Sequence, residues 1–390
     1  MPIKNYLICR NEPFGGIILN QKNGNTFRVD SELFNVFLAY FNGKKPQDPG
    51  VLFKLKFISK DCNKLIYLHQ DQKLIKRDIP IASSPEIVSF SITDYCTKGC
   101  DYCYNDSNPT GSFFDVNKLP LVIKELRLNR VLQVTIGGGE PTFHPDLEKI
   151  LSSFRLAGIV PNLTTNGINI DQKALKFIKK YCGALAFSYD PLYSDIIDEN
   201  IKLAQNLDIA THIHLILSKK ALPKLERDIR PLIDLGIERV TLLLMKPIGR
   251  GKSLLSICLT EGSLIQLNQV INRLLELSNQ FNFQINFDCS FTPFLLHAGI
   301  QFDPVQYDFC PATRFSCSLD HNLMVKPCSM MVNFNGISLE EKSLRRIWNS
   351  NTFKEFRKYF KNLKKVCNSC TFSSICYGGC PMFEKCLEMY

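Results

Sequence analysis

The sequence has no long uncharged apolar run. Residues 1–12 contain no apolar stretch of the kind found in secretory signals, and no later segment is long and uncharged enough to span a bilayer. We therefore expect a cytoplasmic protein without a membrane partner. A chain of 390 residues with 45% hydrophobic residues is not a disordered one, and its length suggests two or three domains.

A chain without a secretion signal has little use for disulfides, yet this one contains 16 cysteines. Most of them are closely spaced, which indicates metal ligation rather than a disulfide framework. Four others are isolated in the sequence and are typical of buried core thiols: Cys9, Cys62, Cys182 and Cys258. The net charge of +10 is compatible with an acidic peptide or a nucleic acid as partner. Because metal-bound thiolates are not counted in that charge, we do not expect nucleic acid.

Polar and apolar residues alternate in six segments after residue 86, and this period of two predicts strands. The strands are expected around 88–92, 132–136, 162–164, 187–190, 212–217 and 240–245, with helical patterns between them at 118–128, 147–157, 172–181, 195–206 and 222–235. The repeated strand–helix unit predicts an α/β fold, a partial (β/α)6 barrel of the TIM type with its active site at the carboxyl ends of the strands. Residues 283–288 also alternate and predict a strand that bridges to a last domain.

Four polar or reactive side chains on these strands are candidates for contact with a substrate or cofactor. His212 and His214 lie opposite the apolar face of the fifth strand, and Asp288 and Cys289 follow the bridging strand. Two core histidines and a buried structural thiol are the alternatives.

The first predicted strand is followed by Cys96, Cys100 and Cys103, in the pattern CxxxCxxC. A four-iron cluster normally takes four cysteines, so three of them leave one iron for a ligand that is not protein. A zinc site is the alternative. The spacing, with Tyr102 before the last cysteine, resembles the radical SAM signature. The resemblance implies that the open iron binds S-adenosylmethionine, whose sulfonium is cleaved to a 5'-deoxyadenosyl radical.

The loops after later strands extend this resemblance. They include the segments Gly137–Pro141, Thr164–Gly167 and Pro247–Gly251. The resemblance implies S-adenosylmethionine contacts from Gly138, Gly139, Glu140, Thr165, Asn166, Ser188, Asp190, Gly249 and Arg250. Glu140 would accept from the methionine amino group, and Ser188 and Asp190 would lie near the ribose. Ordinary turn chemistry is the alternative for each loop.

A dense cysteine motif ends the chain, and it resembles the SPASM domain, a C-terminal extension that carries auxiliary iron-sulfur clusters. The resemblance implies two ligand sets: Cys310, Cys317, Cys328 and Cys380 for one cluster, and Cys367, Cys370, Cys376 and Cys386 for the other. With the first loop, this makes three [4Fe-4S] clusters. The family's glycine five residues before Cys328 is Leu323 here, so we expect Asn322 or His321 to take the left-handed turn position. Two zinc sites are the alternative.

Residues 1–80 contain no cofactor motif. Residues 10–29 predict a hairpin with a turn at Asn23-Gly24, followed by a helix that Asp30 or Ser31 caps. This pattern resembles the small winged-helix-like RiPP recognition element, which binds the leader of a ribosomally made precursor peptide as an added strand. A purely structural or dimerisation domain is the alternative. We thus expect a recognition domain at 1–80, a linker at 81–86, the barrel with its bridging strand at 87–305 and a SPASM domain at 306–390.

Together the resemblances imply an enzyme that abstracts hydrogen from a precursor peptide. The product would be a cross-link, a thioether, an epimerised residue or an excised backbone unit, and the electron donor a flavodoxin or ferredoxin. Alternatives are a maturase of a folded protein, an RNA-modifying radical enzyme and a zinc-stapled binding protein that is not an enzyme.

Overall fold

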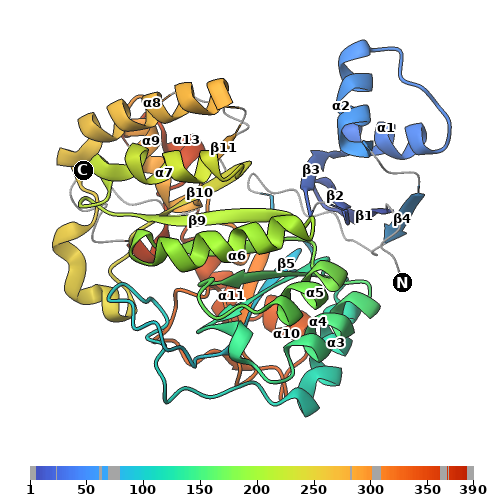
Figure 1. Cartoon of the computed structure of the whole chain (residues 1–390). Helices are drawn as coiled ribbons and strands as arrows, with labels where there is room; N and C mark the ends of the chain where they lie inside the picture. Colours follow the sequence, from blue (N-terminus) through green and yellow to red (C-terminus); the bar gives the residue numbers. More distant parts are fainter. Residues whose placement is uncertain are drawn as a thin grey trace.

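The computed structural model describes residues 6–22, 24–60, 64–68, 80–281, 283–300, 309–360, 367 and 369–383. It has a small N-terminal domain, a central β/α arch and a C-terminal region that closes one side of the arch (Figure 1). The strands are β1 (Tyr6–Glu12), β2 (Gly15–Asn20), β3 (Thr26–Asp30), β4 (Lys64–Leu68), β5 (Ile87–Thr93), β6 (Gln133–Gly138), β7 (Val160–Thr165), β8 (Leu185–Tyr189), β9 (Thr211–Leu217), β10 (Arg239–Leu244), β11 (Gln284–Phe287), β12 (Ser316–Leu319), β13 (Met324–Lys326) and β14 (Ile337–Ser338). The helices are α1 (Ser31–Phe41), α2 (Pro49–Ser59), α3 (Leu119–Leu128), α4 (Leu147–Leu156), α5 (Gln172–Tyr181), α6 (Ser194–Asn206), α7 (Leu225–Asp234), α8 (Leu264–Phe281), α9 (Thr292–His297), α10 (Leu344–Trp348), α11 (Asn351–Lys358) and α13 (Ser373–Cys376).

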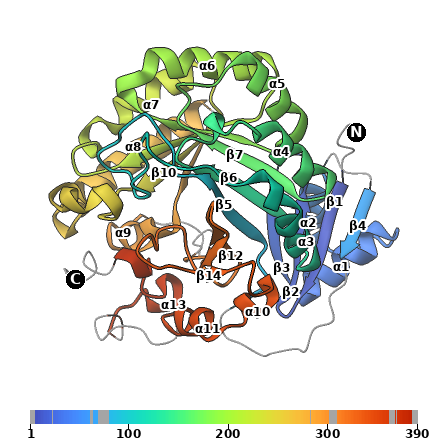
Figure 2. The same ribbon diagram turned by 90° about the horizontal axis from the view of Figure 1, so that it is seen from below.

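The central sheet has the strand order β11-β10-β9-β8-β7-β6-β5-β12-β13-β14. Its strands from β5 to β11 are all parallel. Each of the strands β5 to β10 is followed by a helix, and the helices cover the outer face of the arch (Figure 2). This confirms the predicted α/β fold and its six strand–helix units.

The alternation along the strands sets which side chains face the inside of the arch. On β5, Val88, Phe90 and Ile92 are buried in the main core, whereas Ser89 and Ser91 are half-buried. The apolar side chains gain stability by packing under the outer helices, and this leaves the polar ones for the inner face. On β5 the inner face is therefore polar without any cost to the core.

The C-terminal region joins the sheet through β12, which pairs in parallel with β5. The turn between β12 and β13 corrects one prediction, because Leu323 itself takes the left-handed conformation with φ 62. Its side chain is fully buried in the main core, and the Asp320 carboxylate accepts from the backbone N–H groups of Asn322 and Met324. Burial of a leucine side chain contributes about 2 kcal/mol, enough to offset the roughly 1–2 kcal/mol that a left-handed residue costs.

The N-terminal domain is a four-stranded sheet of order β3-β2-β1-β4 under two helices. Strands β1, β2 and β3 are antiparallel neighbours, and β4 runs parallel to β1. The predicted cap of the first helix is confirmed, since the Asp30 carboxylate accepts from the backbone N–H of Leu33 at 2.8 Å. The predicted hairpin is present as the antiparallel pair β2 and β3, with Asn23 of its expected turn outside the described residues. A turn at Pro13 and Phe14 separates β2 from the additional strand β1.

The second face of this small sheet packs on the base of the arch. Ile17 and Leu19 form one apolar cluster with Leu132, Val160 and Phe315, which lie at the amino ends of β6, β7 and β12. The expected linker at 81–86 is part of this contact, with four of its residues buried: Ala82, Ser84, Pro85 and Glu86. The N-terminal domain therefore shares a hydrophobic core with the barrel.

Arg10 fastens this junction. Its guanidinium is fully buried, lies 2.5 Å from the Glu12 carboxylate and donates to the carbonyl groups of Ser84, Pro85 and Arg130. Burial raises the pKa of Glu12 despite the neighbouring guanidinium. One charged side chain thus satisfies three backbone acceptors that have been taken out of water.

Replacement of Arg10 by Met is expected to destabilise the fold by about 3 kcal/mol or more, because it leaves a buried carboxylate without its partner. The single tryptophan reports on this junction, since the Trp348 indole donates to the Ala82 carbonyl at 3.1 Å. Urea unfolding followed by its fluorescence gives the measurement. Arg230→Met is the control, because that arginine pairs with Glu226 while both side chains are partly exposed, and its loss should cost about 1 kcal/mol or less. Equal losses in the two variants would contradict the assignment.

Across the described residues, no single helix has the length and hydropathy needed to cross a bilayer. One pair, Gly249–Ile257 with Glu261–Phe281, meets that test when its parts are taken together, and these are bent by 65°. In the fold, α8 buries Leu267, Ile271 and Leu274 in the main core.

Candidate active site

A cavity of about 500 Å³ lies at the carboxyl ends of the parallel strands, where the fold predicted it. Residues 318–321, 326, 329, 330 and 332 of the C-terminal region close its other side. The polar alternation of the strands supplies its inner wall: Ser89, Ser91, Thr135, Thr164, Ser188 and His214. The sequence therefore places hydroxyl and imidazole groups around a space large enough for a small cofactor and one residue of a substrate.

The three loop cysteines Cys96, Cys100 and Cys103 all line this cavity. Burial is the main reason that the pKa values of Cys96 and Cys100 are raised, and the Cys103 thiol raises both further. Among the described residues, no group of three or more histidine, cysteine or carboxylate side chains is arranged to hold a metal ion. A four-iron cluster does not need that arrangement, because each thiolate binds a different iron. The three thiols therefore fit a cluster better than a single ion.

Gly249 and Arg250 contact the backbone of the cysteine loop. Arg250 donates from Nε to the Cys100 carbonyl at 2.9 Å, and its backbone N–H donates to the Cys103 carbonyl at 3.0 Å. Gly249 has φ 59, and a Cβ there would lie 2.3 Å from the Tyr104 carbonyl oxygen. Neither residue is among the described residues that line the cavity. Their predicted contact with the cofactor stays a prediction, and the contacts seen are with the loop.

Glu140 ties together the ends of β6 and β7. Its buried Oε1 accepts from the hydroxyls of Thr142 and Thr165 and from the Thr142 N–H, and Oε2 accepts from the Asn166 N–H at 2.6 Å. Burial still raises its pKa. A carboxylate has about four acceptor positions, so only Oε2 keeps room for an external donor. Gly138 and Gly139 fit tightly beside it, and a Cβ on either would lie 2.1 Å from a backbone oxygen.

Asp190 is held by two residues of the cysteine loop. Its Oδ2 lies 3.1 Å from the Lys98 ammonium and accepts from the Tyr102 hydroxyl at 3.3 Å. Asp190 does not itself line the cavity, whereas its neighbour Ser188 does. Sequence reasoning missed Lys98, whose only signal was its position between the first two cysteines of the loop.

Four cysteines from distant parts of the sequence meet next to the cavity. Cys289, Cys310 and Cys328 pack in one cluster, and a hydrogen bond between thiols is the first cause that raises the pKa of Cys289. Cys380 is close enough that Cys289 and Cys328 help raise its pKa to about 12, after burial as the main cause. All four are free thiols. This set provides one thiolate for each iron of a four-iron cluster.

Cys317 is not in this group, although the resemblance implied that it was. It lies on β12 opposite Val88 of β5 and packs in the main core. Burial raises its pKa to about 12, and Arg357 is the neighbouring charge. The register of β12 places Cys317 beside Val88 in the main core and outside the cavity lining, whereas Ser318 lines the cavity.

A second cysteine group forms around α13. Burial is the main cause that raises the pKa of Cys376 to about 12, and Cys367 and Cys370 act on the same thiol. Backbone N–H groups of Gly378 and Gly379 also point at the Cys376 thiol. The predicted fourth member, Cys386, lies outside the described residues. His297 Nε2 is 3.8 Å from Cys370 Sγ, a contact that the sequence did not indicate.

The catalytic candidates lie in three places: two line the cavity, one lies outside its lining, and one belongs to the four-thiol group. His214 lines the cavity and His212 does not. Burial is the main cause that lowers the pKa of each to about 4, so both are neutral near pH 7. Asp288 lines the cavity in an ion pair with Lys246. Cys289 belongs to the four-thiol group.

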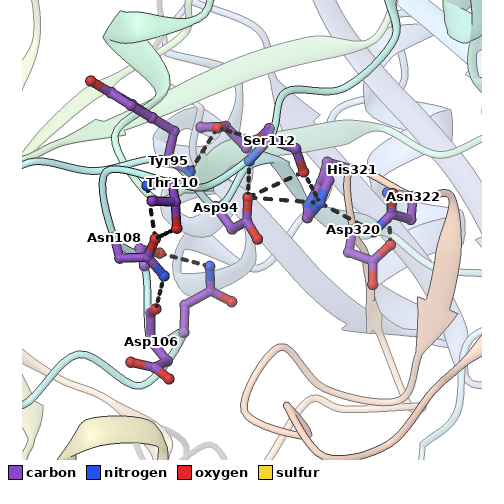
Figure 3. A network of polar contacts seen from close by, with 12 residues as sticks. Asp94, Tyr95, Asp106, Asn108, Thr110, Ser112, Asp320, His321 and Asn322 are labelled. Carbon is purple, nitrogen blue, oxygen red and sulfur yellow. Dashed lines mark hydrogen bonds and ion pairs between the residues drawn. The ribbon is translucent and has the colours of Figure 1, made fainter.

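A polar network joins the arch to the C-terminal region at the rim of the cavity (Figure 3). His321, from the turn between β12 and β13, meets the Ser112 hydroxyl at 2.9 Å. Asp94, which follows β5, accepts from the Ser112 N–H at 2.5 Å and lies 3.8 Å from His321. Both Asp94 and His321 line the cavity. Sequence reasoning did not identify Asp94 as a site residue, because nothing in its local pattern shows which later turn it meets.

Two family models match the chain. Residues 90–201 match the Radical SAM superfamily, and residues 310–371 match SPASM, an iron-sulfur cluster-binding domain. The matched segments contain the cysteine loop and most of the C-terminal cysteines.

Two curated relatives align with most of the chain. The PqqA peptide cyclase of Bradyrhizobium diazoefficiens is 23% identical over 76% of this chain and 81% of its own length. The mycofactocin maturase MftC of Mycobacterium tuberculosis is 22% identical over 76% of this chain and 78% of its own length. Among solved structures, Streptococcus suis SuiB bound to its precursor peptide SuiA superposes with a TM-score of 0.70. It is 18% identical and covers 98% of this chain and 95% of its own, so the likeness concerns the fold.

Proposed function

This chain carries a radical SAM domain followed by a SPASM domain, and from that premise we propose an enzyme that uses S-adenosylmethionine to modify a ribosomally made precursor peptide. The observation that carries the proposal is the set of three thiols at the edge of the strand-end cavity. When bound, a four-iron cluster and S-adenosylmethionine would supply the 5'-deoxyadenosyl radical. Binding and orienting the cluster, the cofactor and the peptide would depend on the residues of this chain.

Those residues bind and orient. Cys96, Cys100 and Cys103 would hold the first cluster, and Arg250 keeps their loop in place through backbone carbonyls. The free position of Glu140 Oε2 is suited to an ammonium group. Ser188 and Asn166 line the cavity beside it and offer further polar contacts. The neutral His214 adds an imidazole that can accept or donate a hydrogen bond.

Two further clusters would use the C-terminal thiols. The first would be held by Cys289, Cys310, Cys328 and Cys380. In this set Cys289 takes the place of Cys317, which the resemblance implied as a ligand. The second would be held by Cys367, Cys370 and Cys376, with Cys386 as the expected fourth ligand. We also propose a cytoplasmic protein that receives electrons from a flavodoxin or ferredoxin.

The N-terminal domain would bind the leader of the precursor. Strand β3 is at the edge of its sheet, so it can accept an added strand. Phe27 on β3 contacts Phe57 of α2, and Phe53 and Phe57 are 71% and 61% exposed. Lys54 and Lys56 are exposed on the same helix. This surface suits an extended leader that carries apolar and acidic side chains.

The direct test is an anaerobic reaction with S-adenosylmethionine, dithionite and the peptide encoded by a short open reading frame beside this gene. Mass spectrometry should find 5'-deoxyadenosine together with a peptide of altered mass. A reconstituted enzyme that forms no 5'-deoxyadenosine would overturn the radical chemistry. One that forms it but never changes a peptide would point to another substrate, a folded protein or RNA.

Glu140→Gln is expected to weaken S-adenosylmethionine binding at least tenfold while the cluster absorption stays intact. An amide in place of the carboxylate removes the charge that pairs with an ammonium, and its NH₂ group must face a protein donor. Equilibrium binding to the reconstituted enzyme gives the measurement. Thr142→Val is the control, because it removes one donor to Oε1 and keeps the charge. Unchanged affinity in Glu140→Gln would contradict this role.

Aspartate at both Phe53 and Phe57 is expected to weaken leader binding more than tenfold, since it removes exposed aromatic anchors and introduces like charge against an acidic leader. Fluorescence anisotropy with a labelled leader and the full chain gives the affinity. Ile265→Asp is the matched control, because Ile265 is 78% exposed on α8 of the barrel. If this control weakens binding as much, the leader does not use the N-terminal surface.

A further inference from the structure

A buried lysine separates the cavity from the four-thiol group. Lys246 follows β10 and lines the cavity, and its side chain is only 9% exposed. Its ammonium lies 2.6 Å from Asp288 Oδ2 and 3.4 Å from the Leu244 carbonyl oxygen. Sequence patterns gave no reason to single it out, because it ends an apolar strand.

Asp288 is itself fixed, so the position of the ammonium is fixed as well. The Asp288 N–H donates to the Leu242 carbonyl at 3.0 Å, and its Oδ1 accepts from the backbone N–H and the hydroxyl of Ser290. The same turn carries Cys289 into the four-thiol group. The ion pair and one thiol are thus parts of a single rigid turn.

The positive end of the pair faces the thiols. The Lys246 charge acts on Cys289, Cys328 and Cys380, lowering the pKa of each against the burial that raises it. Asp288 acts in the opposite sense on Cys289, and on its other side it raises the pKa of His214. The contact of 2.6 Å with the Asp288 carboxylate stabilises the Lys246 ammonium in its charged form.

We propose that Lys246, oriented by Asp288, sets the reduction potential of the cluster that Cys289, Cys310, Cys328 and Cys380 would hold. The inference rests on the proposed function for the presence of that cluster. A fixed positive charge favours the reduced form, which carries one more electron, and a nearby negative charge disfavours it. Lys246 is therefore a positioning residue: it places a positive charge between the cavity and the auxiliary site, where that charge stabilises the reduced cluster.

The two members of the ion pair should shift the midpoint potential in opposite directions when each is replaced. Lys246→Met removes the positive charge and should lower the midpoint potential of this cluster, shifting the ratio of reduced to oxidised cluster about tenfold, which is about 59 mV for one electron. Asp288→Asn removes the negative charge and should raise the potential. A merely structural role would not move the potential in opposite directions.

Lys98→Met is the matched control. Lys98 is another buried cavity lysine, it pairs with Asp190, and it acts on the Cys100 thiol. It should shift the potential of the cluster on the first loop and leave the auxiliary one unchanged. The full chain, reconstituted anaerobically, is titrated potentiometrically with electron paramagnetic resonance detection, and iron content checks that each variant is loaded.

Opposite shifts in the two variants, absent from the control, would support the proposal. Unmoved auxiliary potentials, or shifts of the same sign, would overturn it even if peptide modification is observed. If Lys246→Met does not fold, Lys246→Gln and Asp288→Asn make the same comparison. A loaded wild-type enzyme without any auxiliary cluster signal would overturn both this inference and the proposed cofactor content, whereas failure of peptide modification alone concerns only the proposed function.

Discussion

Alanine at Cys96, Cys100 and Cys103 is expected to remove about one third of the iron and all cleavage of S-adenosylmethionine. The reason is that these thiols would hold one of three four-iron clusters, and a cluster without its thiolates does not persist. The other two proposed ligand sets use Cys289, which follows β11, and thiols of the C-terminal region, so they do not depend on this loop. Iron and sulfide analysis after anaerobic reconstitution, with 5'-deoxyadenosine measured by chromatography, gives both readouts.

Cys182→Ala is the control for that experiment. Cys182 is a half-buried free thiol whose pKa burial raises to about 12, and Arg155 is its charged neighbour. It should keep the full iron content and the cleavage activity. Zinc in place of iron in the wild-type protein, or cleavage that survives in the triple variant, would contradict the assignment of the loop.

The second large effect concerns two cysteines to which the family resemblance gave the opposite roles, with Cys317 as a ligand and Cys289 outside the ligand sets. Cys289→Ser should lose about one third of the iron, because it removes one thiolate from a four-iron site, whereas Cys317→Ser should keep all of it. Both are buried or half-buried free thiols, so each is the other's matched control. Mössbauer spectroscopy of the two variants shows which cluster is missing. Iron loss in Cys317→Ser alone would restore the ligand set that motif spacing implied.

The strands and helices were predictable because they depend on the local periodicity of apolar and polar residues. The alternation of Val88, Phe90 and Ile92 with serines marks a strand whatever the strand pairs with. That the three loop cysteines lie together was predictable for the same reason, since they are spaced within eight residues of one loop.

The composition of the auxiliary site was not predictable in this way. Cys289 joins Cys328 and Cys380 only because β11 extends the parallel sheet and its following turn points inward. Cys317 leaves the set only because β12 pairs with β5 in one register and not in the next. Lys246 ends an apolar strand, and its partner Asp288 is 42 residues away in sequence. Each of these facts depends on tertiary pairing, which a single sequence does not display.

If the N-terminal domain binds the leader as proposed, the two ends of the barrel would give the precursor peptide a minimum length. The N-terminal domain packs on the amino ends of the strands, at Leu132 and Val160, while the cavity lies at their carboxyl ends. A strand such as β6 has six residues, so the barrel alone separates the two sites by about 20 Å. An extended chain needs at least about six residues to cover that distance. The length of the spacer between the recognised segment and the reacting residue would therefore determine which residues can react. Residues too close to the leader could not enter the cavity, however reactive their side chains.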